Sequence, residues 1–163
     1  MAIVVSDATG NVGRPLVAEL AGFEWYLSLA FDAEDQPVLS IDNLGLIAPH
    51  AWESIGFSCQ ASQHFLHSQW NSVATWLALS EEQTPPAPQR SEDAVIWLIW
   101  RRELQAHFRS VSQAEHQALQ SLSAGKSFAD VCAGAAEHNP ESTVQIAGWL
   151  HTWLNEGLLS GIT

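Results

Sequence analysis

The stretch AVIWLIW at residues 94–100, followed by RRE at 101–103 and LQAHFRSV at 104–111, decides the fold of this 163-residue chain. The first run is β-branched and aromatic, and it is too short to span a membrane. In the last run apolar side chains alternate with polar ones, at Leu104, Ala106 and Phe108 and at Gln105, His107 and Arg109. Alternation places the two sets on opposite faces of a strand. The stretch therefore predicts a β-hairpin, although its connection lacks the Asn-Gly pair typical of tight turns.

Signals for three short helices follow the hairpin. Ser112 and Glu115 have the spacing of a capping box, and Ser127 is a second candidate N-cap. The sequence NPE at 139–141 stops one helix and starts the next, because proline suits a first helical turn. Glycines that suit the left-handed residue after a helix occur at Gly125 and Gly157. A hairpin followed by three helices predicts a winged-helix layout.

The first half of the chain predicts a mixed, mainly helical region. Apolar residues recur at helical spacing over 15–31, short helical turns are expected over 39–52, and residues 56–60 are extended. Asn71 or Ser72 is placed to cap a further helix. A proline-rich connector occupies 84–91. We therefore predict an α+β protein: an N-terminal helical or mixed region over 1–83, a linker, and a winged-helix-like, peptide-binding domain over 92–163.

Charge favours a peptide over DNA as the ligand of such a domain. The chain has 18 acidic and 6 basic residues, and the second and third helices of the predicted domain contain no Lys or Arg. DNA binding draws most of its affinity from neutralised phosphates. A DNA-binding regulator is thus the alternative function, and neither nucleic acid nor membrane is an expected partner. The eight tryptophans suit an accessory protein with an apolar docking surface.

The residues predict no catalytic or metal site. Cys59 and Cys132 lack a CxxC pattern and are expected to be buried thiols in a reducing cytosol. His64 and His67 would face opposite sides of an extended stretch, without a third ligand. The sequence shows no set of acid, base and nucleophile, so we expect the chain to be non-catalytic on its own. It has no signal-peptide pattern or membrane-spanning segment, which predicts a cytoplasmic protein.

Residues 1–15 contain a misleading motif. AIVV at 2–5 and ATGNVG at 8–13 resemble the opening of a dinucleotide-binding reductase. However, Asp7 stands where a glycine is expected, and it would place a carboxylate where pyrophosphate approaches the backbone. A nucleotide-dependent reductase is therefore a third function class that rests on these residues alone.

A series of short motifs resembles the HvfC/BufC proteins and the MbnC proteins of methanobactin biosynthesis. The motifs occur in order over residues 16–160, as LAGFEW (20–25), AFDA (30–33), LHSQW (66–70), TW (75–76), IWR (99–101), LSAG (122–125) and WLNEGLL (153–159). These proteins are partners of multinuclear non-haem iron oxidases that modify cysteines in precursor peptides. Many carry a further helical region in front, so the resemblance implies a short MbnC-like member or a trimmed one.

The resemblance implies a non-catalytic subunit in a heterodimer with such an oxidase, in copper-related peptide biosynthesis. The iron is expected in the partner, and no cofactor in this chain. The precursor's leader would pair with the free edge of the strand at 104–111 and reach pockets between that strand and the third helix. The predicted peptide-binding residues are Arg101, Arg102, Leu104, Ala106, Phe108, Arg109, Ala147 and Leu150.

Two plainer interpretations of these residues stay open at this point. The pattern is explained equally well if Phe108 and Leu150 are core residues, because alternation does not distinguish a pocket from a core. The three arginines, which we expect to meet leader carboxylates, also suit charges that guard a strand edge. If Phe108 lines a pocket, Phe108→Asp should weaken leader binding more than it lowers stability.

Overall fold

A computed structural model describes residues 15–45, 47–136 and 142–163, and it shows a mixed α+β fold. The dinucleotide-like motif at the start of the chain and the NPE motif at 139–141 lie outside the described residues. The helices are α1 (Pro15–Asp32), α2 (Ile41–Leu44), α3 (Ser72–Ser80), α4 (Gln113–Ser123), α5 (Phe128–Ala136) and α6 (Ser142–Asn155), with a 3-10 helix η1 (Pro49–Glu53). The strands are β1 (Phe57–Cys59), β2 (His64–Trp70), β3 (Arg90–Arg102), β4 (Gln105–Val111) and β5 (Leu159–Ile162).

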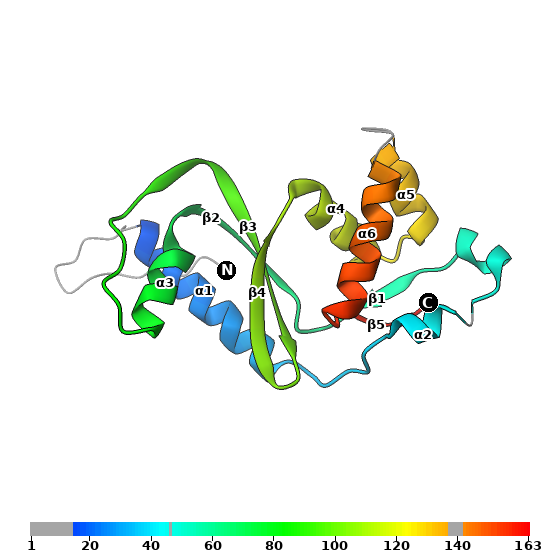
Figure 1. Ribbon diagram of the computed structural model, residues 1–163, viewed down its shortest axis with the longest axis horizontal. Coiled ribbons are helices and arrows are strands. Elements are labelled where there is room, and N and C mark those ends of the chain that lie inside the picture. The colour runs from blue at the N-terminus through cyan, green and yellow to red at the C-terminus, as the bar shows by residue number, and fades with distance from the viewer. Residues whose placement is uncertain (1–14, 46, 137–141) are drawn as a thin grey trace.

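The centre of the fold is a three-stranded antiparallel sheet in the order β2-β3-β4. Helices α1 and α3 lie on one side of this sheet, and α4, α5 and α6 lie on the other, as Figure 1 shows. A second, two-stranded antiparallel sheet pairs β1 with β5. Among the described helices, none is long and apolar enough to cross a membrane.

The apolar run of β3 serves two hydrophobic cores because its side chains alternate between the faces of the sheet. Leu98 is fully buried in the larger core, which the sheet shares with α4, α5 and α6. Ile99, the next residue, is fully buried in the smaller core beneath α1. Phe23 of α1 lies at the centre of that smaller core, with no exposed surface. A continuous apolar run is what a strand covered on both faces requires.

Pairing between strands crosses the expected boundary between the two halves. Strand β2 precedes the proline-rich connector and β3 follows it, yet the two pair from His64 with Ile99 to Trp70 with Arg90. Likewise β1, from the first half, pairs with β5 at the end of the chain. The connector itself forms no helix or strand from residue 83 to 89. The regions predicted as 1–83 and 92–163 therefore share both sheets.

The helix ends follow the predicted signals closely. The Ser112 hydroxyl accepts a hydrogen bond from the Glu115 amide at 3.1 Å, and the Ser127 hydroxyl accepts one from the Asp130 amide at 3.1 Å. Gly125 and Gly157 have φ angles of +83° and +69°, the left-handed conformation that glycine adopts at low cost. One detail of the prediction is wrong: no bond returns from the Glu115 carboxylate to the Ser112 amide, since that carboxylate binds Arg109 and Trp153 instead.

The predicted hairpin is present, and its turn is tighter than the sequence suggested. Arg102 pairs with Gln105, so the loop contains only Glu103 and Leu104. Both have positive φ, of 50° and 62°, as in a type I′ turn. Leu104 therefore belongs to the turn and not to the strand, which corrects the predicted start of the second strand. A left-handed conformation costs a residue with a Cβ about 1 kcal/mol or more.

Candidate functional site

The outer edge of β4 is the candidate site, because it has hydrogen-bonding groups that no described strand uses. β4 is the terminal strand of the sheet, and its seven residues pair with β3 without a register shift. A two-residue turn closes with a bond between its flanking residues, and such bonds then recur at every second residue. Ala106, Phe108 and Ser110 consequently turn their N–H and C=O groups away from β3.

The opposite edge of the same sheet is closed at one end. On β2, the Glu19 carboxylate of α1 accepts hydrogen bonds from the amides of Gln69 and Trp70, each at 2.9 Å. The pairing of β2 with β3 is also irregular between Ser68 and Trp70. Capping and irregular pairing are two ways in which proteins protect a sheet edge from further pairing. Among the described residues, the outer groups of β4 have one side-chain contact, from Arg109 Nη1 to the Ser110 carbonyl at 3.5 Å, and the strand pairs without a register shift. The two edges therefore differ in what they offer a guest strand.

A partly buried ion network fixes β4 to the helices on one face. Arg109 donates to both carboxylate oxygens of Glu115, at 2.6 and 3.1 Å, and to both of Glu156, at 2.9 and 3.0 Å. Glu115 also accepts from the indole nitrogen of Trp153 at 2.9 Å. Both Glu115 and Trp153 are buried. The network thus ties the edge strand to the start of α4 and the end of α6.

The charges of this network already engage Arg109, one of the predicted peptide-binding residues. Burial on its own would lower the pKa of Arg109, but the hydrogen bonds and charges of Glu115 and Glu156 raise it above its ordinary value. The guanidinium stays charged and is engaged by two carboxylates. Bidentate arginine–carboxylate pairs of this kind are strong and geometrically specific. Arg109 is therefore placed to hold the edge strand, and it has no free fork for a leader carboxylate.

The other two predicted arginines are also engaged within the chain. Arg101 donates to the Phe31 carbonyl at 2.8 Å and forms an ion pair with Asp35, and only 13% of its side chain is exposed. Arg102 donates to the Asn155 carbonyl at 2.6 Å. It remains half exposed and lies 3.5 Å from a Glu103 carboxylate oxygen. Of the three, Arg102 alone is open to an outside carboxylate.

The predicted pocket between the strand and the third helix does not bring its residues together. The Phe108 ring is half-buried and packs against the smaller core, where its centroid lies 5.0 Å from that of Phe23 and 5.8 Å from that of Trp76. Leu150 of α6 is buried in the larger core, across the sheet. Ala147 is exposed on α6. Since Phe108 and Leu150 lie on opposite faces, the core interpretation explains both better than a shared pocket does.

A histidine pair lies on the face of the sheet that α4 covers. His116 is only 4% exposed, its ring contacts those of Phe65 and His67, and its Nδ1 atom has no hydrogen-bond partner among the described residues. Burial, and then the nearby His67, lower the pKa of His116 below its ordinary 6.5. As predicted, His64 lies on the other face of β2, where it stacks on Tyr26.

The lowered pKa of His116 predicts acid sensitivity with a definite sign. Well above pH 6.5 both the folded and the unfolded chain carry a neutral imidazole, so His116 has no effect on stability there. As the pH falls from 6.5 toward the folded-state pKa, the unfolded chain takes up the proton first and stability drops. The slope is at most about 1.4 kcal/mol per pH unit.

We expect His116→Phe to flatten the stability profile between pH 7 and pH 5, measured by urea unfolding at each pH. His50→Gln serves as the control, because His50 is exposed in η1 and should leave the slope unchanged. An identical slope in wild type and His116→Phe would show that His116 does not cause the acid sensitivity.

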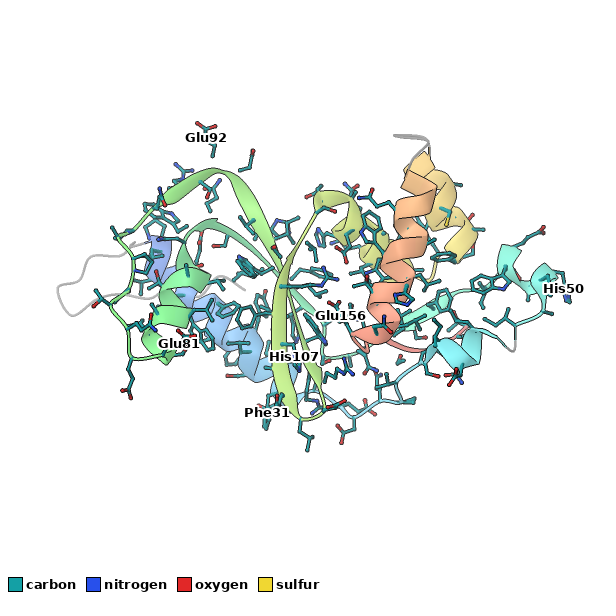
Figure 2. All side chains as sticks on the ribbon, in the orientation of Figure 1. Phe31, His50, Glu81, Glu92, His107 and Glu156 are labelled. Carbon is teal, nitrogen blue, oxygen red and sulfur yellow. The ribbon has the colours of Figure 1, made fainter. Side chains whose placement is uncertain are left out.

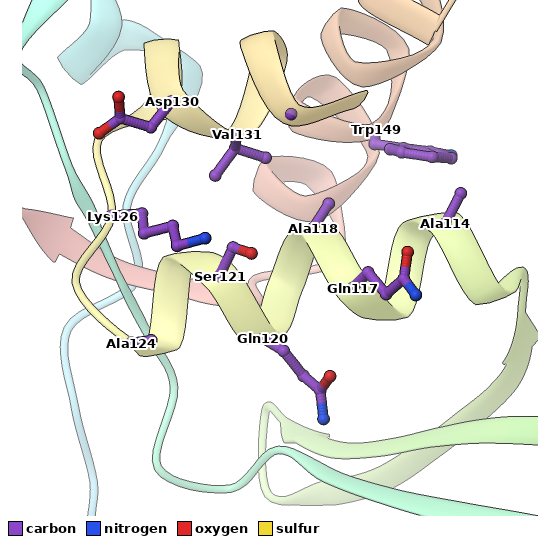
Figure 3. Close-up of a pocket in the computed structure, with 11 residues that line it drawn as sticks. Ala114, Gln117, Ala118, Gln120, Ser121, Ala124, Lys126, Asp130, Val131 and Trp149 are labelled. Atoms are coloured by element: carbon purple, nitrogen blue, oxygen red, sulfur yellow. The ribbon is translucent and has the colours of Figure 1, made fainter. Parts of the chain in front are cut away.

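A pocket of about 470 Å³ opens between α4, α5 and α6. Figure 3 shows Lys126, Ser121 and Asp130 toward one end of it, with Ala118 and Trp149 toward the other. Lys126 and Asp130 are the charged side chains among the described residues that line it.

Metal-binding and thiol residues are dispersed in the described part of the chain. There, no three His, Cys, Asp or Glu side chains come together in a way that could hold a metal ion. Cys59 and Cys132 are half-buried free cysteines, and burial raises the pKa of each thiol. A raised pKa keeps a thiol protonated and therefore less reactive.

Sequence reasoning missed two features of this region. The role of Glu115 was hidden, because its spacing from Ser112 suggests a backbone cap and nothing in the sequence links it to Arg109. The closure of the β2 edge by Glu19 was missed for a similar reason, since the two lie about fifty residues apart in the chain. The left-handed turn had one usable signal, namely that only the three residues 101–103 separate the two strand patterns.

Comparison with family models, with curated proteins and with solved structures finds no match for this chain.

Proposed function

We propose that this chain is a non-catalytic accessory subunit that binds the leader of a ribosomal precursor peptide. It would form a heterodimer with a multinuclear non-haem iron oxidase that modifies cysteines of that precursor, in methanobactin-like, copper-related biosynthesis. The ordered motifs that resemble HvfC/BufC and MbnC proteins support the partner and the pathway. The observation that carries the binding role is the regular outer edge of β4, which pairs with no other strand in the part of the chain that the structure describes.

Binding at this edge would work by strand addition. Ala106, Phe108 and Ser110 together present three N–H and three C=O groups on this edge, of which the Ser110 carbonyl also accepts from Arg109 Nη1 at 3.5 Å. Each hydrogen bond contributes about 1 kcal/mol net, so the backbone supplies affinity without reading sequence. The seven residues of β4 are matched by a guest about 23 Å long. Specificity then has to come from the side chains of the guest that face the two sides of the sheet.

The charges near the edge indicate what kind of leader segment would bind. On the side of α6, Glu115 and Glu156 outnumber the single Arg109 that they share. Arg101 is paired as well. An apolar or basic segment is therefore a better match than an acidic one, which departs from our prediction for Arg101 and Arg109, while Arg102 is still open to a leader carboxylate.

We further propose that the hairpin β3–β4 and the helices α4, α5 and α6 form a winged-helix-like peptide-recognition unit. Two arrangements support this reading: β4 leads directly into α4, and the Arg109 network joins the edge strand to both α4 and α6. In such a unit the helices would hold the edge strand in place, so that a guest meets a preorganised edge.

A proline at an outward-facing position tests strand addition directly. We expect Ser110→Pro to weaken leader binding at least tenfold while its Tm stays near that of wild type. Proline removes the outward N–H of Ser110 that a guest would use, but no bond to β3. The measurement is titration of a fluorescent synthetic leader into the complex of this chain with a multinuclear non-haem iron oxidase of the proposed class, together with a thermal melt.

Ser110→Ala is the matched control, because it keeps the backbone N–H and should bind the leader like wild type. His107→Pro is the opposite control, since it removes a bond within the sheet and should lower the Tm. Equal leader affinity in Ser110→Pro and Ser110→Ala would exclude strand addition at this edge. Salt-dependent binding of a 25-base-pair duplex, with no leader binding, would instead favour the DNA-binding regulator.

A further inference from the structure

The turn of the β3–β4 hairpin combines backbone strain with an exposed apolar side chain. Glu103 and Leu104 both adopt left-handed φ angles, a conformation for which Asn-Gly is the favoured pair. Leu104 is 70% exposed, the highest value among the large hydrophobic side chains that the structure describes. Strained backbone at a surface position is more common where it serves a function. Leu104 is neither buried nor suited to its backbone conformation, and we therefore infer that its side chain has a binding role.

Two other exposed apolar side chains lie at the same end of the sheet. Val38 and Leu104 line one hollow of about 160 Å³, and Val38 is itself 58% exposed. Phe31 is 54% exposed, and its carbonyl accepts from Arg101 of β3. Figure 2 shows Phe31 where the hairpin turns. We call Phe31, Val38 and Leu104 the tip patch.

Acidic side chains surround the tip patch. Asp32 and Glu34 are exposed beside Phe31, and the side chains of Asp35 and Glu103 are 86% and 82% exposed. Arg101 is neutralised by Asp35, so the rim carries net negative charge despite the nearby arginines. An apolar centre inside a charged rim is the usual composition of a protein–protein interface.

We propose that the tip patch is the docking surface for the partner enzyme, which would present an apolar pocket with a Lys- or Arg-rich rim. Charge complementarity selects this occupant. A second copy of the chain fits poorly, because the chain has 18 acidic residues and only 6 basic ones, and of the two arginines near the tip only Arg102 is open to a carboxylate. An anionic membrane would be repelled by the same rim.

This inference rests on the proposed function and adds a geometric consequence to it. The tip directly adjoins Gln105, where β4 begins. A leader paired along β4 would therefore have one end beside the docked enzyme. The edge would hold the leader and the tip would place it at the enzyme, which is how one small subunit serves both tasks.

A variant with an unstrained turn distinguishes an effect on docking from an effect on folding. We expect the double variant Glu103→Asn with Leu104→Gly to raise the Tm by about 4 °C, because Asn-Gly removes the strain. The same variant should bind the oxidase at least tenfold more weakly and the leader as wild type does. A purified multinuclear non-haem iron oxidase of the proposed class is the probe, with its affinity measured by biolayer interferometry and leader binding by fluorescence.

Two single variants complete the test. Leu104→Ala keeps the strained turn and removes the side chain, so it should lose oxidase affinity without a gain in Tm. Leu79→Ala is the control for an exposed leucine, because Leu79 is 52% exposed on α3 and should bind the oxidase as wild type does.

The possible outcomes are distinct. Unchanged oxidase affinity in the relaxed turn would overturn docking at the tip and leave leader binding intact. A wild-type chain that binds neither leader nor oxidase would refute the proposed function, and the docking inference with it. A wild-type dimer in light scattering that Leu104→Ala dissociates would show that the occupant is a second copy, against this proposal.

Discussion

Replacing Glu115 by alanine is expected to lower the free energy of unfolding by about 3 kcal/mol. Two kinds of contact are lost at once. Arg109 loses a bidentate partner, and the Trp153 indole N–H, which is completely buried, loses its acceptor. A buried donor without a partner bears its full desolvation cost. Glu156 still neutralises Arg109, which keeps the loss at the lower end of the range for broken buried pairs. Urea unfolding monitored by tryptophan fluorescence measures the change.

Two further variants separate the contributions to this loss. Glu115→Gln keeps an acceptor for Trp153 but removes the charge, so it should fall between wild type and Glu115→Ala. Glu115→Ala combined with Arg109→Ala should cost at least 1 kcal/mol less than the sum of the two single changes, because contacting residues couple. Glu53→Ala is the control for an exposed glutamate and should stay within about 0.5 kcal/mol of wild type. A loss below 1 kcal/mol for Glu115→Ala would mean that solvent screens the network.

The local structure could be predicted from the sequence because it depends on neighbouring residues. Caps at Ser112 and Ser127 and left-handed glycines at 125 and 157 act over three or four positions, and all four signals are confirmed. The hairpin strands are confirmed for the same reason, since alternation reports directly on a pleated strand. The helix predicted over 15–31 is confirmed as α1, which ends one residue later.

The pairing between distant segments could not be predicted in this way. Strand β2 has no marker for its partner, and the prolines after it suggested a boundary that the pairing of β2 with β3 crosses. Ionic contacts have the same difficulty: the charges of Glu115, Arg109 and Glu156 are visible in the sequence, but their convergence follows only from the packing of α4, β4 and α6. The sequence predicted that the site is a strand edge, but not which side chains lie at it. Those side chains depend on how the faces of the strand are oriented relative to the helices.

Replacing Phe108 by alanine is expected to lower the free energy of unfolding by about 3 kcal/mol. Its ring forms edge-to-face contacts with Phe23, Trp76 and Trp97, at centroid distances of 5.0, 5.8 and 6.1 Å. Such contacts add to the burial of the ring, and truncation leaves a cavity beneath α1. Phe108→Asp should cost more, because it also places a carboxylate in an apolar core. Guanidinium unfolding followed by circular dichroism measures both variants.

Comparing Phe108→Ala with Phe31→Ala decides whether the Phe108 ring is part of the core or lines a leader pocket. Phe31 is 54% exposed at the end of α1, so its truncation should change stability by no more than about 0.5 kcal/mol. Phe108→Leu retains bulk in the core and should preserve leader binding, because the outward N–H and C=O of residue 108 remain in place. If Phe108→Ala were as stable as Phe31→Ala yet bound the leader poorly, the ring would line a leader pocket, and the packing against Phe23 would not contribute to stability. A loss of stability in Phe108→Ala, with leader affinity kept in Phe108→Leu, is the result that assigns the ring to the core and the backbone of β4 to the peptide.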